Sequence, residues 1–344
     1  MFAEVDAAAR AALGVRYSAA VVRIEHRGTV RFERAYGRTR DDGPSRDVGV
    51  DTRFDLASIT KVFIASIVLD DAARSVVALD EPLRELVPEW DGADRARITL
   101  RKILAHDAGF KSGADYRTLL ARDVETFALT EPLAAPSGER VIYSDLGFIA
   151  LGVILARRHR RGLATLVAER LRGWGAARTG YVPDAAERDA IPATESDAWR
   201  GSVQGTVHDE KAHLLGGIAG HAGLFGTARD VALLGEWFLG PLHGRPTPLA
   251  PAFARDAVLE AAHDPILRRG LGWALKTSDE NSCGPLMSAQ TFGHTGFTGT
   301  CVWADPVRDL NVVFLTNAVH HGRTDIRALR AAVCDAAVRA IDAA

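Results

Sequence analysis

The hydrophobic pattern changes its period twice along the 344 residues, and this constrains the fold most strongly. Residues 19–25 and 29–36 are rich in β-branched and aromatic side chains and flank an Arg27-Gly28 turn, which predicts a β-hairpin. Strand-like runs return near the C-terminus, whereas the residues between follow the helical period of about 3.6. The simplest assembly is therefore one antiparallel sheet built from both ends of the chain, with a helical lobe inserted.

The same patterns locate the individual elements. Residues 1–14 are expected to form an exposed amphipathic helix, and residues 173–225, dense in glycine, proline and polar side chains, are expected to form ordered loops over a site. The remaining expected elements are helices at 58–72, 99–105, 116–127, 145–157, 163–171, 229–239 and 323–343, and strands at 271–276, 291–294, 300–305 and 310–316. We expect residues 1–55 with 240–344 to form a sheet domain, residues 56–239 a mostly helical domain, and a catalytic cleft to lie between them.

Charge and hydropathy exclude several classes of protein. With 42 basic and 44 acidic side chains there is no positive excess to hold a phosphate backbone, so no nucleic-acid partner is expected. The longest apolar runs, residues 62–69 and 147–156, are shorter than the roughly 20 residues that span a bilayer, so no membrane partner is expected either. The N-terminus carries acidic residues where a signal peptide needs a basic end, which predicts a cytoplasmic location.

The three cysteines indicate neither a disulfide framework nor a zinc knuckle. Cys283, Cys301 and Cys334 are odd in number and show no CxxC spacing, so buried free thiols are expected. Histidines and carboxylates at His208, Asp209, Glu210, His213 and His221 are of the types that bind zinc, but their spacing matches no helical metal pair. We predict no metal and no cofactor, and we expect His320-His321 to lie in an exposed turn.

The stretch Ser58-Ile59-Thr60-Lys61 is the first candidate for chemistry. One helical turn separates the serine from the lysine, so both project from one face and the amine can reach the hydroxyl. The N–H groups at the start of the helix favour a developing oxyanion. By itself the pattern is equally compatible with a helix cap and a surface lysine.

Two further groups of residues are candidates for the same site. A tyrosine at a helix entrance, Tyr143, can act as a proton relay beside a lysine, and Asp145 can orient Lys61 or a substrate amide. Each alone is also explained by packing and by helix capping. His294-Thr295-Gly296 lies in a glycine-rich strand, where a backbone N–H can complete an oxyanion hole, although a bulge with a core histidine explains it too.

The order Ser-x-x-Lys, Tyr-x-Asp and His-Thr-Gly resembles the serine β-lactamase and penicillin-binding-protein superfamily. The likeness is closest to its class C-like branch, with esterases, D,D-peptidases and penicillin-binding-protein 4B-like members. Residues 52–61, 79–83 and 98–110 are similar to family segments at and after the nucleophile, and residues 207–212 and 216–225 to a loop-to-helix segment. The resemblance implies a mixed α/β (α+β) fold of the β-lactamase/transpeptidase type.

The resemblance also implies roles for single residues. Ser58 attacks the carbonyl group, Lys61 and Tyr143 share the proton transfers, and the N–H groups of Ser58 and Phe297 hold the oxyanion. His294 stands where β-lactamases usually carry lysine, and a histidine is only partly charged near neutral pH. Asp145 replaces the usual asparagine. Asp145, His294, Thr295, Gly296 and Phe297 are thus the expected substrate-binding residues.

These observations predict a serine hydrolase that forms an acyl-enzyme with an ester or amide of a small molecule. A D,D-peptidase or D-amino-acid peptidase with weak β-lactamase activity is the alternative within the family. A ligand-binding module that has lost turnover is the alternative of another class. The partner is expected to be a small molecule or a short peptide, and the sequence leaves the oligomeric state open.

Overall fold

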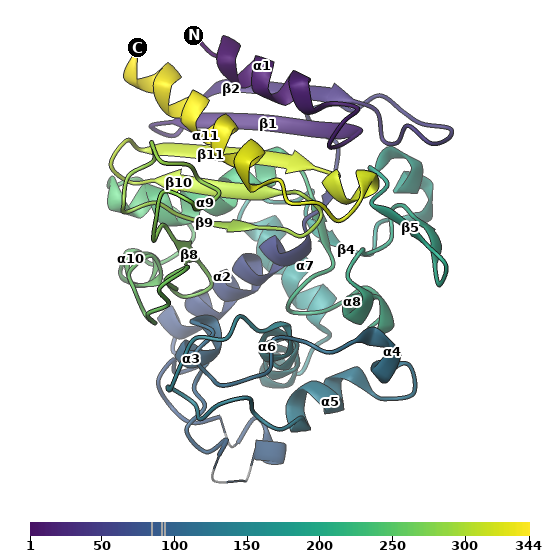
Figure 1. The fold of residues 1–344 in the computed structure, drawn as a ribbon. Coiled ribbons are helices and arrows are strands. Elements are labelled where there is room, and N and C mark those ends of the chain that lie inside the picture. Colours follow the sequence, from purple (N-terminus) through teal and green to yellow (C-terminus); the bar gives the residue numbers. More distant parts are fainter. Residues whose placement is uncertain (84, 91, 93) are drawn as a thin grey trace.

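The computed structural model describes residues 1–83, 85–90, 92 and 94–344. Its main sheet joins both ends of the chain in the strand order β2-β1-β11-β10-β9-β8, with every neighbouring pair antiparallel (Figure 1). The predicted hairpin and the predicted two-ended sheet are thereby confirmed. The strands are β1 (Ala19–His26), β2 (Thr29–Gly37), β8 (Ala274–Leu275), β9 (Phe292–Thr295), β10 (Cys301–Asp305) and β11 (Leu310–Thr316).

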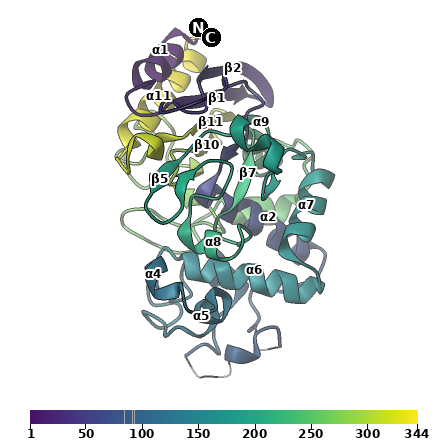
Figure 2. The same ribbon diagram turned by 90° about the vertical axis from the view of Figure 1, so that its right-hand side faces the viewer.

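Terminal helices cover one face of this sheet. α1 (Ala3–Ala12) and α11 (Arg327–Asp342) lie against each other, and the two chain ends meet at the same end of the molecule (Figures 1 and 2). α1 is amphipathic as expected, but its apolar side is buried through Val5, Ala9 and Ala12, because α11 supplies a partner surface. α9 (Ala228–Leu242) packs on β1, β10 and β11 from the other face.

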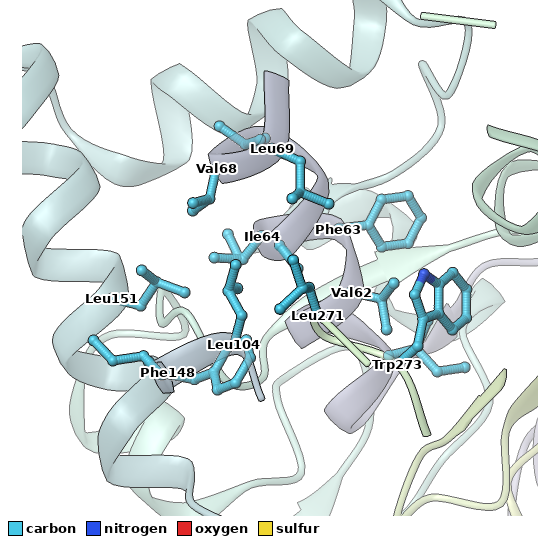
Figure 3. Close-up of a cluster of buried hydrophobic side chains, with 14 of the residues drawn as sticks. Val62, Phe63, Ile64, Val68, Leu69, Leu104, Phe148, Leu151, Leu271 and Trp273 are labelled. Atoms are coloured by element: carbon cyan, nitrogen blue, oxygen red, sulfur yellow. The ribbon is translucent and has the colours of Figure 1, made fainter. Parts of the chain in front are cut away.

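The helical lobe is built around α2 (Thr60–Ala73), which follows directly from the site serine. α2 is buried along almost its whole length, and its apolar residues are spread around the helix, which suits a helix enclosed by other elements. Its residues Val62, Ile64 and Val68 lie among side chains of other helices and of the segment before β8 (Figure 3). The other helices of the lobe are α3 (Leu100–Leu104), α4 (Tyr116–Leu119), α5 (Val124–Thr130), α6 (Asp145–His159) and α7 (Leu163–Gly173).

Three expectations differ from the observed elements. The expected helix 116–127 is two helices, because the carboxylate of Asp123 caps a new start at α5. The expected strand 271–276 is reduced to β8, because the N–H of Gly270 bonds to the carbonyl of Trp273 in a tight turn. α10 (Pro251–Ala257) was not predicted.

The region 173–225 is long and ordered as expected, but it also contains short elements. β7 (Leu224–Gly226) joins β3 (Phe54–Asp55) and β4 (Gly180–Tyr181) in a second sheet that sits beside the start of α2. The others are β5 (Glu195–Asp197), β6 (Gly201–Val203), α8 (Glu210–Leu214) and the 3₁₀ helix η3 (Ala185–Ala190). Two- and three-residue strands carry too little periodicity to be predicted from sequence.

The three cysteines are buried and free, as expected. Among the described residues, no helix has both the length and the apolar character needed to cross a membrane.

Candidate active site

Ser58 lies in the 3₁₀ helix η1 (Ala57–Ile59), directly before α2. Ala57 has a φ of 46°, a left-handed conformation that costs a residue other than glycine about 1 kcal/mol or more. The buried carboxylate of Asp55 holds this turn, because it accepts the N–H of Ala57 at 2.8 Å and that of His208 at 2.6 Å. Burial raises the pKa of Asp55 to about 6. A strained and fixed backbone therefore presents Ser58, and the part that Asp55 plays in it could not be predicted from the sequence.

Lys61 is fully buried beneath the serine. Its Nζ lies 3.1 Å from the Oγ of Ser58 and also donates to the Oδ1 of Asp145 at 2.8 Å and to the carbonyl of His221 at 3.1 Å. Burial alone would lower the pKa of Lys61, but Asp145 first and then Tyr143 more than offset it, so the pKa is raised. The side chain therefore rests as an ammonium ion.

A charged network continues behind Lys61. Lys211 lies 3.2 Å from Asp145 and 3.1 Å from Asp209, and Asp209 contacts the Nε2 of His221 at 2.7 Å. Carboxylates and ammonium groups alternate, so each buried charge has an opposite neighbour. Of the two roles expected for Asp145, this position supports the orientation of Lys61. Lys211 was not among the predicted site residues, because its contact with Asp145 joins two distant segments of the chain.

Two groups of histidines and carboxylates bear on metal binding. Within the described chain, possible ligand atoms of Asp145, Asp209 and His221 lie within 4.8 Å of one another. The ammonium group of Lys211 forms ion pairs with both carboxylates, so these carboxylates already have a cationic partner. His320 and His321 lie in the 3₁₀ helix η4 (Ala318–His321).

Each of those two imidazoles bonds to one oxygen of the Asp41 carboxylate. The distances are 3.0 Å for His320 and 2.8 Å for His321, and Asp41 itself is exposed. These bonds fasten η4 to the loop after β2, and no metal is needed to explain the grouping.

Tyr143 lies between the charged network and the cleft. The Nζ of Lys61 is 4.9 Å from the centre of its ring, and the imidazole of His106 packs 4.5 Å from it. His106 has a φ of 59°, and its Nδ1 accepts the N–H of Ser144 at 3.0 Å. Burial holds the pKa of His106 well below its usual value, so the ring is neutral. His106 thus positions Tyr143, a role that its place in the family-like stretch 98–110 did not reveal.

His294 is buried and neutral, where the sequence suggested a partly charged histidine. Burial first, then Lys61 and Arg269, lowers its pKa to about 3. Its Nδ1 lies 2.9 Å from the carbonyl of Thr295, which fixes the proton on Nδ1 and leaves a lone pair on Nε2. In the described residues that Nε2 has no partner. It can therefore accept a hydrogen bond from a bound molecule, but it cannot serve as a cation.

The neutral His294 has a measurable effect on acid stability. The unfolded chain protonates this histidine below about pH 6.5 and the folded chain does not, so the free energy of unfolding falls as the pH drops from 6.5 towards 3. Between pH 7 and pH 5, we expect the free energy of unfolding of His294→Gln to fall by about 2 kcal/mol less than that of the wild type, as measured by urea unfolding. The control is His263→Gln at an exposed histidine, which should leave the pH dependence of stability as in the wild type. If His294→Gln also kept the wild-type pH dependence, His294 would be charged in the folded protein.

The predicted residues meet at one cleft of about 560 Å³. Lys61 and Asp145 lie outside its lining, behind Ser58. A Cβ on Gly296 would come within 2.1 Å of Thr300 and 2.6 Å of the Leu56 carbonyl, so only glycine lets β9 approach the serine turn. The cleft is lined by six of the eight predicted site residues: Ser58, Tyr143, His294, Thr295, Gly296 and Phe297.

Two backbone N–H groups face this cleft without a partner in the described chain. In η1 the N–H of Ala57 bonds to Asp55 and that of Ile59 to the Leu56 carbonyl, whereas the N–H of Ser58 between them has no acceptor. The N–H of Phe297 has no acceptor either. The ring of Phe297 is 58% exposed and stacks on His208. The pair of N–H groups has the chemistry of an oxyanion hole.

The comparisons with known proteins agree with this geometry. A family model described as beta-lactamase matches residues 5–335. The chain belongs to the β-lactamase family. The predicted superfamily and the predicted class of enzyme, a serine hydrolase, are confirmed.

Relatives of this β-lactamase-family chain have several described activities. It is 29% identical over 305 residues to a protein from Escherichia coli strain K12 named "Putative D-alanyl-D-alanine carboxypeptidase", covering 78% of this chain and 70% of the relative. It is 28% identical over 306 residues to an N-acetylmuramyl-L-alanine amidase from Bacillus subtilis strain 168, and the match covers 78% of this chain and 68% of that relative. The solved structure of EstCE1, described as a hydrolase with promiscuous acyltransferase activity, superposes with a TM-score of 0.78 at 22% identity and covers 97% of both chains. The fold prediction is thereby confirmed.

Proposed function

We propose that this chain hydrolyses an ester or amide of a small molecule or short peptide through an acyl-enzyme on Ser58. The observation that carries the proposal is the 3.1 Å contact between the Ser58 hydroxyl and the buried Lys61 ammonium at the floor of the cleft. A serine hydroxyl is a weak nucleophile until a neighbouring group removes its proton. Tyr143 lines the same cleft as Ser58, and the centre of its ring is 4.9 Å from the Nζ of Lys61, which supports a part for it in the proton transfers.

Lys61 and Tyr143 act as one proton-transfer pair in this mechanism. The pair reacts in the form that has given one proton to solvent, and the two groups share the remaining proton between them. The phenol oxygen of Tyr143 then takes the proton of Ser58 as Oγ bonds to the substrate carbon. The negative charge that forms on the carbonyl oxygen is held by the N–H groups of Ser58 and Phe297.

The second half of the reaction reverses these transfers. Tyr143 returns the proton to the departing oxygen or nitrogen as the tetrahedral intermediate collapses to the acyl-enzyme. A water molecule then gives its proton to Tyr143 and attacks the acyl carbon. Ser58 leaves with that proton, and the acid product is released.

Peptide hydrolysis is the second candidate within the same mechanism. The names of the Escherichia coli and Bacillus subtilis relatives describe activities on amide bonds, whereas EstCE1 is described more broadly as a hydrolase. Arg269, which lines the cleft and makes no ion pair within the described residues, also favours a substrate with an acidic group. The cytoplasmic location expected from the sequence remains a prediction.

Covalent labelling tests the proposed nucleophile directly. We expect a fluorophosphonate to add once to the folded protein, and trypsin then to release residues 54–61 as an adduct, because cleavage follows Arg53 and Lys61. This peptide contains a single serine, Ser58. Urea-unfolded protein, in which Lys61 and Tyr143 are no longer assembled, is the control and should stay unlabelled. Absence of the adduct from the folded protein would support the binding-module alternative.

A further inference from the structure

Asp41, His320 and His321 bring three possible metal-ligand atoms together outside the active site. The Nε2 of His320 lies 3.0 Å from one oxygen of Asp41, the Nε2 of His321 lies 2.8 Å from the other, and one ligand atom of each residue lies within 4.8 Å of the other two. The hydrogen bonds account for the grouping, and they also turn both Nε2 atoms towards one point. Because 279 and 280 positions separate the partners, their spacing in the sequence could not reveal the group.

The carboxylate of Asp41 has no lysine or arginine at ion-pair distance in the part of the chain that the structure describes. Its ion-pair partners there are the two histidines, which unlike lysine and arginine carry no permanent charge at neutral pH. This distinguishes the group from Asp145, Asp209 and His221, where the ammonium of Lys211 pairs with both carboxylates. The negative charge of Asp41 is therefore available to a bound cation.

The group is both held in place and open to solvent. The side chain of His320 is 6% exposed and that of His321 is 18% exposed, so the surrounding protein restricts both imidazoles. The side chain of Asp41 is 46% exposed, so an ion can approach from its side. The carboxylate of Asp42 also lies 3.5 Å from the Nε2 of His320, but it already bonds to the Nε of Arg40 at 2.6 Å.

We propose that Asp41, His320 and His321 bind a divalent transition-metal ion, for which Zn²⁺ is the best match. Two imidazole nitrogens and a carboxylate oxygen are donors that zinc accepts, whereas Mg²⁺ and Ca²⁺ prefer sites built from oxygen alone. Each neutral imidazole carries its proton on Nδ1 in the metal-bound form and gives the lone pair of Nε2 to the ion. Since Asp42 is engaged by Arg40, the fourth position falls to a water molecule.

The position of this group gives the ion a structural role next to the cleft. His320 and His321 lie in η4 together with Ala318 and Val319, which line the cleft. The N–H of Val319 bonds to the carbonyl of Thr298, directly after the residue whose N–H is assigned to the oxyanion hole. A bound ion therefore ties the loop after β2 to the segment beside the oxyanion hole. The metal site itself does not depend on the proposed function.

Calorimetric titration of the full chain with ZnCl₂ near neutral pH tests the site, after chelator treatment and dialysis. We expect a single Zn²⁺ per wild-type chain, and a dissociation constant at least about 10-fold higher in Asp41→Asn and in His321→Gln, because each loses one of three ligands. Glutamine at 321 keeps an N–H donor for Asp41, so this variant removes the metal ligand while the contact between the loop and η4 can persist. MgCl₂ should bind at least about 10-fold more weakly than ZnCl₂.

The control variant is His263→Gln. The imidazole of His263 bonds to one carboxylate, that of Glu260, at 2.7 Å, and no second histidine joins this pair among the described residues. This variant should keep the wild-type affinity and stoichiometry for Zn²⁺. Urea unfolding of the metal-free proteins checks that each variant is folded, and His320→Gln replaces either ligand variant that is not.

Three outcomes overturn the proposal. The first is no binding of Zn²⁺ by folded wild-type protein. The second is an unchanged affinity in both Asp41→Asn and His321→Gln, which would place the ion elsewhere. The third is an equal loss in His263→Gln, which would show that Zn²⁺ binds to surface histidines without selection. Fluorophosphonate labelling of the metal-free wild type reports on Ser58 separately, so failure of the metal site and failure of the nucleophile are distinguishable.

Discussion

Replacement of Ser58 by alanine is expected to lower kcat by on the order of 10⁶-fold, the scale on which a serine hydrolase loses activity without its nucleophile. Lys61 and Tyr143 remain in place in this variant, but they have no hydroxyl to deprotonate. The fold should persist, because the Lys61 ammonium keeps its bonds to Asp145 at 2.8 Å and to the carbonyl of His221 at 3.1 Å. The free energy of unfolding should change by about 1 kcal/mol or less, the net value of one hydrogen bond.

Ser66→Ala is the matched control for this substitution. Ser66 lies on α2, the helix that follows Ser58, is buried, and bonds back to the carbonyl of Val62 at 2.9 Å, away from the cleft. It should lose a similar amount of stability and no activity. Hydrolysis of 4-nitrophenyl acetate by Ser58→Ala at the wild-type rate would contradict the assignment of the nucleophile.

Replacement of Tyr143 by phenylalanine is expected to lower kcat by about 10²- to 10⁴-fold, as loss of a general acid-base group does. The ring keeps its packing on His106 and its contact with the Lys61 ammonium, because both contacts involve the face of the ring. Only the proton-carrying oxygen is lost. Lys61 cannot replace it efficiently, because its pKa is raised beside Asp145 and it holds its proton.

The kinetic form of the loss separates a chemical role from a binding role. Tyr143→Phe should lower kcat and kcat/KM together and slow fluorophosphonate labelling of Ser58, with KM nearly unchanged. Tyr181→Phe is the matched control, since its buried hydroxyl bonds to the Ala219 carbonyl at 2.7 Å and does not line the cleft. A rise in KM alone for Tyr143→Phe would remove Tyr143 from the proton transfers and leave it a binding residue.

The charged network has a further consequence for the reaction. Asp145 carries a negative charge and lies between two ammonium groups, those of Lys61 and Lys211. Because Lys211 also contacts Asp209, the charges of the two lysines nearly cancel those of the two carboxylates. A buried carboxylate next to the site is therefore stable in this chain. The positive charge that faces the cleft near Tyr143 comes from Arg269 and not from His294, which is neutral.

Much of the framework was predictable from sequence because it depends on local patterns. The largely apolar run at residues 310–316 matches β11 at both ends, since a strand that is buried on both faces is apolar and rich in β-branched residues. The spacing of Ser58 and Lys61 predicted their contact, because one helical turn fixes how far apart two side chains lie. The family-like order of motifs then added Tyr143 and His294, which no local pattern favoured on its own.

Tertiary structure alone decided the groups that tune this site. Asp55, His106 and Lys211 act through partners far away in the chain, as Asp55 does on the N–H of His208, 153 positions later. No periodicity encodes such pairs. The charge of His294 was likewise set by burial, which depends on every element packed around it. Residue types and short spacings determined the fold class of this protein and the choice of its proposed nucleophile. The protonation state of His294 and the burial of Arg269 in the cleft wall, by contrast, arise only where distant segments enclose these side chains.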